Sequence, residues 1–426
     1  MMKKNIFWFR RDLRLEDNTA LAYSLLEKAN VIPIFIFDEK IINTLSKNDS
    51  RITFIYNQLE KINKQLKHYN SSLLVLKGNP TEVFQNLISR YDIRSVFSNQ
   101  DYEPYALKRD VEITQLLKDN EISHIQYKDQ VIFEPNEILK EDGTPYTVYT
   151  PYKNKWLNRF REKPVEIFNE INFSNFCNNA FDFPTLNQIG FENSSINVRD
   201  YTLTILDKYK ENRDVPADDK TSYLSVHLRF GTVSIRKIIS LLNKNEAFLS
   251  ELIWREFFMQ ILFNFPHVVT QSFKKKYDSI KWRNNKKEFE KWCEGKTGYP
   301  IVDAGMRQLN QTGYMHNRVR MIVAGFLCKH LLIDWRWGEK YFAQKLLDYE
   351  LSSNNGNWQW AAGTGCDAAP YFRIFNPFTQ QKKFDKEFKY INCWIDNFDE
   401  KNYLEYIVDH KFARKRALER YKQIML

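Results

Sequence analysis

The chain has 426 residues, of which 43% are hydrophobic and 27% charged, and its 63 Lys and Arg residues exceed its 53 Asp and Glu residues. This composition excludes a disulfide-stapled miniature and a largely disordered chain, and at roughly 150 residues per domain it allows two or three domains. The longest apolar stretches fall far short of the ~20 residues that span a bilayer, and the formal net charge of +10 favours a polyanionic partner such as nucleic acid.

Targeting and metal signals are weak. Residues 1–14 carry lysines and arginines inside an apolar run, unlike a secretory signal, so we expect the protein in the cytoplasm. The five cysteines form no C-x-x-C pair, and the seven histidines have no metal-ligand spacing. The sequence therefore predicts neither a disulfide framework nor a metal site.

The first third of the chain alternates short apolar runs with amphipathic stretches. We predict strands at 5–10, 31–37, 72–76, 95–98 and 124–127. We predict helices between them at 19–28, 51–69, 81–90 and 105–120. This alternation predicts an α/β domain over residues 1–132, with a doubly wound, Rossmann-like parallel sheet.

The remainder of the chain divides into two parts. Residues 133–198 are rich in Asn, Pro and Phe, and we interpret them as a long surface connection between domains. Residues 199–426 have helical periodicity without strand-like alternation, which predicts an all-helical domain. The expected helices are 199–212, 235–243, 248–263, 302–311, 317–330, 338–347 and 402–422.

The sheet domain lacks both the G-x-G-x-x-G and the G-x-x-x-x-G-K-[ST] motifs, so we expect any cofactor in the helical half. There, the segment from Lys220 to Ser225 places the three aliphatic hydroxyls of Thr221, Ser222 and Ser225 just before a helical run. Such a segment can hold phosphate oxygens, although the residues alone favour a plain helix N-cap.

Three helical-half segments are unusually polar. Helical spacing puts Glu251 beside Trp254 and Arg255, and a carboxylate there needs a task or a partner, unless it forms a Glu251–Arg255 pair on a solvated face. Asn317 similarly falls beside Arg320 and Met321. The run from Asn354 to Trp360 contains three asparagines and a glycine, from which we predict a tight turn.

At these residues the chain resembles the DNA photolyase and cryptochrome flavoprotein family, most closely the class I cyclobutane pyrimidine dimer photolyases. The resemblance runs nearly end to end. Its most specific runs are residues 7–14, 149–152, 296–304 and 367–377. It implies an antenna-type α/β domain followed by a helical domain that holds FAD, active as reduced FADH⁻.

The family motifs also imply site residues. Those that would hold FAD are Tyr209, Thr221, Ser222, Tyr223, Leu224, Ser225, Arg255, Asn317, Arg320, Asp348, Tyr349, Glu350 and Asn354. Among these, Asn354 would face flavin N5. Glu350 departs from the family, which usually has an aspartate at this position.

The implied reaction is light-driven splitting of a pyrimidine dimer that is flipped out of UV-damaged DNA. The enzyme would be a carbon–carbon lyase, acting as a monomer without a membrane or an obligate protein partner. Glu251, aided by Asn317, would donate a hydrogen bond to the pyrimidine carbonyls, which requires that burial keep its carboxyl protonated. The implied DNA and lesion contacts are Arg213, Glu251, Trp254, Asn317, Arg318, Met321, Trp360 and Gln380.

The tryptophans match a family electron-transfer chain in part. Trp358, Trp335 and Trp282 would carry electrons from the surface to the flavin. We expect three other tryptophans to serve only in side-chain packing and not in electron transfer: Trp292, Trp337 and Trp394.

The antenna pigment is less defined. Folate-binding relatives carry an Asn-Glu pair in the segment that is Asp101 to Ala106 here, and a Cys-Lys pair around residues 267–271. Both pairs are missing, which disfavours folate. A deazaflavin, another flavin or no antenna all stay open.

Three alternatives fit less well. A cryptochrome-type light sensor often has a long C-terminal extension, whereas this sequence stops at Leu426 and keeps the residues implied for repair. Enzymes for (6-4) photoproducts have a histidine where this chain has Asn317. A flavin-free basic DNA-binding module leaves the polar cluster near Asn354 unexplained.

Overall fold

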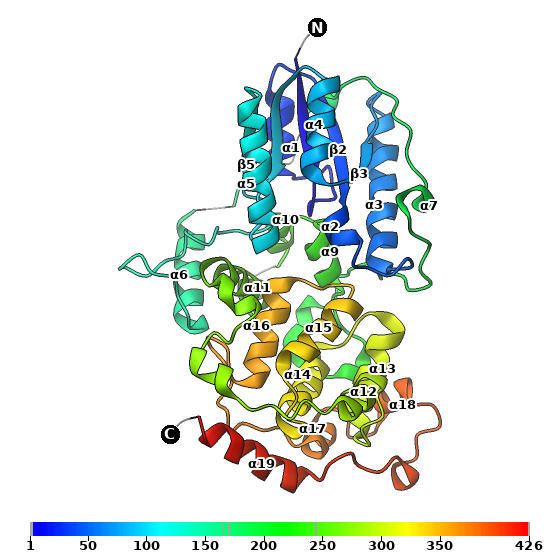
Figure 1. The fold of residues 1–426 in the computed structure, drawn as a ribbon, viewed down its shortest axis with the longest axis vertical. Coiled ribbons are helices and arrows are strands. Elements are labelled where there is room, and N and C mark those ends of the chain that lie inside the picture. The colour runs from blue at the N-terminus through cyan, green and yellow to red at the C-terminus, as the bar shows by residue number, and fades with distance from the viewer. Residues whose placement is uncertain (1–2, 164, 169–170, 243–244, 425–426) are drawn as a thin grey trace. The chain divides into compact units, whose positions relative to one another are not determined.

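The computed structural model describes residues 3–163, 165–168, 171–242 and 245–424. Their contacts divide the chain into two compact units, each drawn as a ribbon in Figure 1. Unit 1 consists of Met1–Ile138, Lys155–Asp200 and Leu224–Lys244. Unit 2 consists of Leu139–Asn154, Tyr201–Tyr223 and Asn245–Leu426.

Unit 1 is built on a five-stranded parallel sheet in the order β3-β2-β1-β4-β5 (Figure 1). The strands are β1 (Lys4–Phe9), β2 (Val31–Asp38), β3 (Leu74–Gly78), β4 (Ile93–Asn99) and β5 (Ser123–Tyr127). Strand β2 is buried along its whole length, as expected for a parallel sheet covered on both faces. The five predicted strands are therefore confirmed.

The helices of the sheet follow the predicted places closely. They are α1 (Thr19–Leu26), α2 (Glu39–Ile42), α3 (Ser50–Lys67), α4 (Pro80–Arg90) and α5 (Pro104–Asp119). Because crossovers are right-handed and the strand order reverses between β1 and β4, α4 and α5 lie on the face opposite to α1 and α3. Ile6 and Trp8 of β1 pack in one core with Phe84 of α4 and Ile113 of α5. The expected doubly wound sheet is confirmed.

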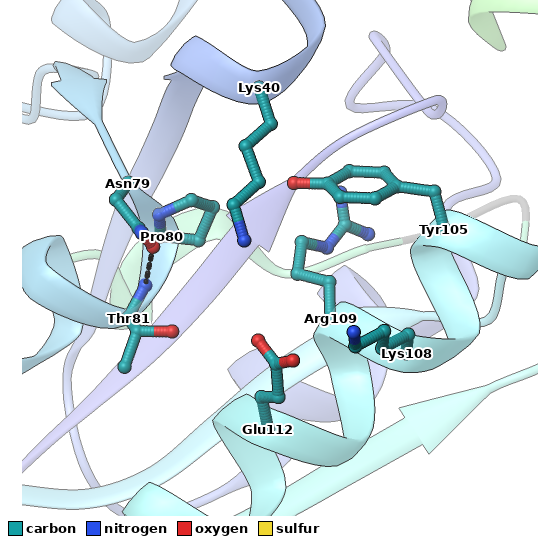
Figure 2. Close-up of a pocket in the computed structure, with 8 residues that line it drawn as sticks. All are labelled: Lys40, Asn79, Pro80, Thr81, Tyr105, Lys108, Arg109 and Glu112. Atoms are coloured by element: carbon teal, nitrogen blue, oxygen red, sulfur yellow. Dashed lines mark hydrogen bonds between the residues drawn. The ribbon is translucent and has the colours of Figure 1, made fainter.

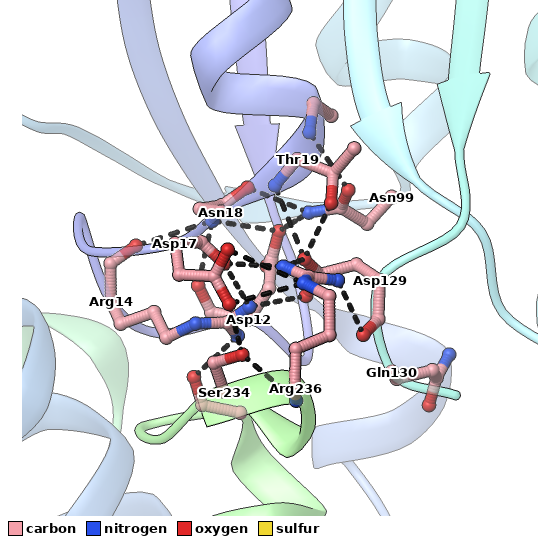
Figure 3. Close-up of polar contacts among 12 residues, drawn as sticks. Asp12, Arg14, Asp17, Asn18, Thr19, Asn99, Asp129, Gln130, Ser234 and Arg236 are labelled. Carbon is pink, nitrogen blue, oxygen red and sulfur yellow. Dashed lines mark hydrogen bonds and ion pairs between the residues drawn. The ribbon is translucent and has the colours of Figure 1, made fainter. Parts of the chain in front are cut away.

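Unit 1 also contains α9 (Leu224–Phe230) and α10 (Ile235–Ser240), which differs from the predicted boundary at residue 198. A buried ion network, shown in Figure 3, links α10 to the segments that follow β1 and β5. Arg236 pairs with Asp17 at 3.1 Å and with Asp129 at 2.8 Å, and Arg14 pairs with Asp129 at 2.7 Å. Burial raises the pKa of Asp129, but the positive charges of Arg14 and Arg236 have the larger effect. They hold the pKa of Asp129 at about 2. Residue 243, where the predicted helix 235–243 ended, lies outside the described residues.

The predicted surface connection over 133–198 is more structured than expected. It contains α6 (Tyr149–Glu162), α7 (Leu186–Ile189) and a 3₁₀ turn at Phe173–Asn175. Trp156 and Phe176 are fully or almost fully buried, so this part of the chain contributes to a core. The missed helix α6 is rich in Lys, Arg and Asn, which weakened its apolar periodicity.

Unit 2 is helical, and every strand among the described residues lies in unit 1. Its first helices are α8 (Tyr209–Asn212), α11 (Glu246–Asn264), α12 (Lys286–Glu294), α13 (Pro300–Thr312), α14 (Asn317–Gly325) and α15 (Trp335–Lys345). They are followed by α16 (Leu351–Ala362), α17 (Pro377–Phe384), α18 (Lys389–Trp394) and α19 (His410–Lys422). One π-helical turn, Phe326–His330, extends α14, and 3₁₀ turns occur at Leu206–Lys208, Pro216–Asp218, Pro266–Val269, Lys275–Ser279 and Glu400–Asn402.

Two helical predictions and one turn prediction for unit 2 differ from the structure. Only the end of the predicted helix 199–212 is helical, and the predicted helix 402–422 begins at His410, where Asp409 caps its N-terminus. The run from Asn354 to Trp360 is part of α16 and not a tight turn. Glycine is needed at position 356 because a Cβ there would stand 2.1 Å from Cδ1 of Phe258. Helix α16 can therefore approach α11 this closely only with glycine.

Within the described part of the chain, no helix combines the length and apolarity needed to cross a membrane.

Candidate functional site

Helix α11 carries two of the predicted lesion residues, and each has a partner outside the helix. Glu251 Oε1 lies 2.7 Å from Arg213 Nη1, and both side chains are partly exposed. Burial raises the pKa of Glu251, and the charge and hydrogen bond of Arg213 oppose this rise. Arg255 is therefore not the partner of Glu251, and the alternative of a Glu251–Arg255 pair is wrong.

Trp254 forms an aromatic stack that we did not predict. The Tyr149 ring lies parallel to it, with centroids 3.6 Å apart and 7° between the planes. The Tyr149 hydroxyl lies 2.6 Å from Ser250 Oγ. The backbone N–H of Tyr149 donates to Asp367 Oδ2 at 3.1 Å. Phe257 and Phe258 flank Trp254 at 5.5 and 5.4 Å. Tyr149 belongs to a run quoted for the family resemblance, yet its spacing gave no sign of this contact.

Helix α14 begins with the predicted residues Asn317 and Arg318. The Asn317 side chain is exposed, and the His316 side chain caps the helix. Arg318 Nη2 lies 2.7 Å from Asp214 Oδ1, and its Nη1 lies 3.6 Å from the Met321 sulfur. Its guanidinium also lies 4.5 Å from the centre of a ring of α17, that of Phe384.

The other two predicted lesion residues lie on different helices. Gln380 is on α17, and Trp360 is half-buried on α16, packed against the main core of unit 2. No direct ring contact between Trp254 and Trp360 is found among the described residues. Because α11 and α16 pack against each other, the two tryptophans belong to neighbouring helices.

Two arginine–carboxylate pairs join residues predicted to surround the cofactor. Arg255 Nη2 lies 3.3 Å from Oε1 of the buried Glu350, whose other oxygen accepts a hydrogen bond from Ser353 at 3.1 Å. Arg320 makes a two-pronged contact with Asp348, at 3.2 and 2.9 Å, and donates to the Met315 carbonyl at 2.7 Å. The longer side chain of Glu350 is thus accommodated by its pairing with Arg255.

The predicted phosphate-binding segment is held in a strained loop. Tyr223 has φ +53°, a conformation that non-glycine residues rarely adopt, and its ring lies 4.9 Å from that of Tyr314. The Tyr314 hydroxyl donates to Thr221 Oγ1 at 3.3 Å. The Ser222 carbonyl accepts from the Thr202 N–H at 2.9 Å.

The remaining residues of this predicted set lie nearby in sequence or on other elements. Leu224 and Ser225 are the first residues of α9 in unit 1. Tyr209 opens α8 and packs edge-on against Phe248, with centroids 4.9 Å apart. Tyr349 is partly buried against the main core of unit 2.

Asn354 is buried, and its amide has a defined orientation. Its Nδ2 donates to Glu339 Oε1 at 2.8 Å and to the Glu339 carbonyl at 3.1 Å. Both hydrogens of the amide therefore point toward α15, which leaves Oδ1 as the acceptor for a ligand. Burial raises the pKa of Glu339, and the Asn354 hydrogen bond opposes the rise. Sequence analysis missed Glu339, because a lone glutamate fifteen residues away gives no spacing signal.

The three tryptophans of the predicted chain belong to the same region of unit 2. Trp358 and Trp335 are buried in its main core, and Trp282 packs against that core. Trp358 contacts Phe342 and Trp292 with centroids 5.0 and 6.1 Å apart. Direct ring contact does not link the three predicted tryptophans within the described residues, so the electron-transfer chain stays a prediction.

The donor set of unit 2 fits a flavin dinucleotide. Arg255 and Arg320 supply guanidiniums, and Thr221 and Ser222 supply hydroxyls suited to phosphate oxygens. Asn354 supplies an oriented amide oxygen that can accept from a flavin N–H. In the described residues, no group of three or more His, Cys, Asp or Glu side chains is placed to hold a metal ion.

Comparisons with known proteins agree on one family. Residues 5–169 match the family DNA photolyase, and residues 248–401 match the FAD binding domain of DNA photolyase. A deoxyribodipyrimidine photo-lyase of Synechococcus sp. is 36% identical, with 92% of this chain and 87% of that protein covered.

Two solved structures resemble the whole chain. A bacterial class III photolyase from Agrobacterium tumefaciens has a TM-score of 0.87 and 33% identity, covering 100% of this chain and 98% of that one. An archaeal photolyase from Sulfolobus tokodaii, solved with two FAD molecules, has a TM-score of 0.84 and 35% identity, covering 99% and 100%.

Proposed function

Because the chain belongs to the DNA photolyase family, we propose that it is a light-driven lyase that splits cyclobutane pyrimidine dimers in DNA with FAD bound in unit 2. The observation that carries the proposal is the clustering on α11. Glu251 and Trp254 lie within one turn of each other, and each is held by a partner, Arg213 and Tyr149. The closer likeness to class I enzymes stays a prediction, since one structural relative is a class III photolyase.

The aromatic residues would receive the extruded lesion. Tyr149 covers one face of the Trp254 ring. The ring is therefore already oriented before a ligand binds. Stacking of a base on an aromatic side chain is worth about 1–3 kcal/mol. Met321 and Trp360 would supply further apolar contacts. Arg318 and Gln380 would contact the DNA around the lesion.

Glu251 would act as the hydrogen-bond donor to the pyrimidine carbonyls. It can do so only when protonated, and burial raises its pKa in the required direction. Arg213 opposes this, and a phosphate of bound DNA would draw the guanidinium away from Glu251. Asn317, exposed at the start of α14, would provide a second donor.

The cofactor residues would orient the flavin. When bound, reduced and excited by light, the flavin would supply one electron for splitting the cyclobutane ring and would take it back afterwards, so the reaction would have no net redox change. Arg255, Arg320 and the Thr221 hydroxyl would bind its polar groups. Asn354 would present Oδ1 to the flavin because Glu339 holds its amide nitrogen. Trp358, Trp335 and Trp282 would conduct electrons from the surface.

We also propose a second chromophore in unit 1. The Sulfolobus tokodaii relative was solved with two FAD molecules, which supports a flavin over folate. A cavity of about 250 Å³ lies at the carboxyl ends of strands β2 and β3, where ligands of open α/β sheets bind. Figure 2 shows the residues that line it. Lys40 and Lys108 line it beside the start of α4 and would meet a flavin phosphate, together with Arg109, which is paired with Asp110, and the carboxylate of Glu112. Released chromophore from denatured protein should give more than one flavin per chain, and a ratio of one would contradict the proposal.

Photorepair of a defined lesion tests the main proposal. The purified FAD-loaded chain is incubated with oligonucleotides carrying one thymine dimer or one (6-4) photoproduct, with and without blue light. We expect restored thymines only for the dimer and only in light. Repair in the dark, or no repair of the dimer, would contradict the proposal.

Variants separate the roles. Glu251→Ala should lower repair per photon without abolishing DNA binding. Trp358→Phe should slow photoreduction of oxidised flavin, with Trp394→Phe as the matched control among tryptophans expected only to pack. We further expect a monomer that works in the cytoplasm, which size-exclusion chromatography and cell fractionation would test.

A further inference from the structure

Unit 2 has an exposed aromatic surface that the proposed lesion pocket does not use. Phe378 on α17 is 40% exposed and Tyr406 is 55% exposed, although both are large rings. Both rest on the buried Tyr299 ring, with centroids 5.3 and 4.9 Å away. Their own centroids are 5.3 Å apart with the planes at 86°. We call these two rings the aromatic platform.

The platform is held in place by the backbone beneath it. The Ile407 N–H donates to the Thr297 carbonyl at 2.9 Å, and the Tyr299 hydroxyl donates to the Val408 carbonyl at 2.7 Å. A Cβ on Gly298 would stand 2.3 Å from the Glu405 carbonyl oxygen, so only glycine allows this close approach. Tyr406 is therefore preorganised, which lowers the entropy that a binding partner must offset.

The charge next to the platform favours an anionic partner. A shallow cavity of about 310 Å³ is lined by Phe378, Thr379, Lys382 and Lys383. Lys382 follows Phe378 by four residues, so both project from the same face of α17. Aromatic rings interleaved with lysines are typical of surfaces that bind single-stranded nucleic acid, where bases stack and phosphates meet cations.

Helix α17 also connects the platform to the DNA contacts proposed above. Phe384, at the other end of α17, lies 4.5 Å from the guanidinium of Arg318. Phe378 and Phe384 are six positions apart, which is about 9 Å along the axis of α17 and about 120° around it. A DNA strand that keeps the roughly 3.4 Å spacing of stacked bases covers the axial distance in two or three nucleotides.

We propose that Phe378 and Tyr406 form a stacking site for one unpaired base of the damaged strand, two or three nucleotides from the dimer, and that Lys382 and Lys383 bind the phosphates next to it. The inference rests on the proposed function for the position of the dimer. The chemistry of the site, a π-face between phosphate-binding amines, does not depend on it.

The test is binding in the dark of the FAD-loaded full chain to a labelled single-stranded oligonucleotide with one thymine dimer. Tyr406→Leu keeps an apolar side chain on Tyr299 but removes the aromatic face, and it should weaken binding about fivefold or more. Tyr406→Phe should retain binding within about twofold. Phe412→Leu is the matched control, because Phe412 is 59% exposed on α19, outside the platform.

Abasic substitutions locate the base. The wild type should lose affinity at one position two or three nucleotides from the dimer, whereas Tyr406→Leu should be insensitive there. Phe378→Leu provides an independent variant, and thermal unfolding checks that each variant is folded. The proposal is overturned if both leucine variants bind like the wild type, if no abasic position matters, or if Tyr406→Leu weakens binding to an intact duplex equally.

The two proposals fail differently. If the wild type binds damaged and undamaged single strands equally and repairs neither, the proposed function fails. A loss of affinity for the undamaged strand in Tyr406→Leu would then still support the stacking site. If the wild type repairs dimers but the leucine variants keep full affinity, only the stacking site fails.

Discussion

If Glu251 donates a hydrogen bond to the lesion as proposed, the Arg213–Glu251 pair should set the pH range over which it can do so. The two side chains are 2.7 Å apart and 29% and 33% exposed. Burial raises the pKa of Glu251, and Arg213 is the largest influence that lowers it. Arg213→Ala therefore raises this pKa further, and repair that depends on protonated Glu251 should persist to higher pH.

The partial exposure of the pair limits the size of the effect. Ion pairs with this access to solvent are worth about 0.2–1 kcal/mol. At a pH above the pKa, losing that interaction increases the protonated fraction of Glu251 by about 1.4- to 5-fold. The same factor should appear in repair per photon on the alkaline limb of the profile.

The assay uses a thymine-dimer dinucleotide at saturating concentration, so that loss of a DNA contact by Arg213 does not dominate. Repair per absorbed photon is measured from pH 5 to pH 9. Lys210→Ala is the matched control, because it removes an equal charge from the short helix α8, which ends directly before Arg213. A profile that stays in place in Arg213→Ala, or that moves to lower pH, would refute the reasoning.

Three further predictions concern Glu339, Gly356 and Lys329. Glu339→Ala removes a 2.8 Å bond from the Asn354 amide and should speed air oxidation of the reduced flavin about tenfold or more, measured by absorbance; an unchanged rate would count against it. Gly356→Ala should lower stability by about 1–3 kcal/mol in urea unfolding, because its Cβ would stand 2.1 Å from a ring carbon, whereas the more open Gly325→Ala should lose less. Burial lowers the pKa of Lys329 to about 7, so above pH 7 the unfolded chain binds a proton that the folded chain lacks. Stability should therefore rise by about 2–3 kcal/mol more between pH 7 and pH 9 in the wild type than in Lys329→Met, and parallel curves would rule this out.

The sheet could be predicted because its signals are local. Each strand is a short apolar run bounded by polar residues, and β2 is buried at every position, so burial and sequence carry the same pattern. Helix α16 could not be predicted in this way. Its asparagines and glycine are poor helix formers, and tertiary contacts such as the one between Gly356 and Phe258 override that propensity.

The candidate site was predicted residue by residue through the family motifs, but its contacts were not. Arg213 and Glu251 are 38 positions apart, and Tyr149 and Trp254 are 105 apart, so helical spacing gives no information about either pair. The spacing argument instead suggested Arg255 as a partner of Glu251. The structure pairs Arg255 with Glu350, since a buried guanidinium and a buried carboxylate cost less together than apart.

The arginines of the proposed site are already paired, and this affects how the chain would bind DNA. The two arginines proposed to contact DNA form the pairs Arg213–Glu251 and Arg318–Asp214. A guanidinium that keeps its carboxylate brings no net charge to a phosphate, so it releases no counterion on binding. Arg213 would contribute to the salt dependence of DNA binding because a phosphate would draw it away from Glu251, whereas Arg318 should contribute less than exposed lysines such as Lys382 and Lys383. The Arg318–Asp214 pair instead fixes the direction of that guanidinium, which suits recognition of one lesion geometry better than general attraction to a polyanion.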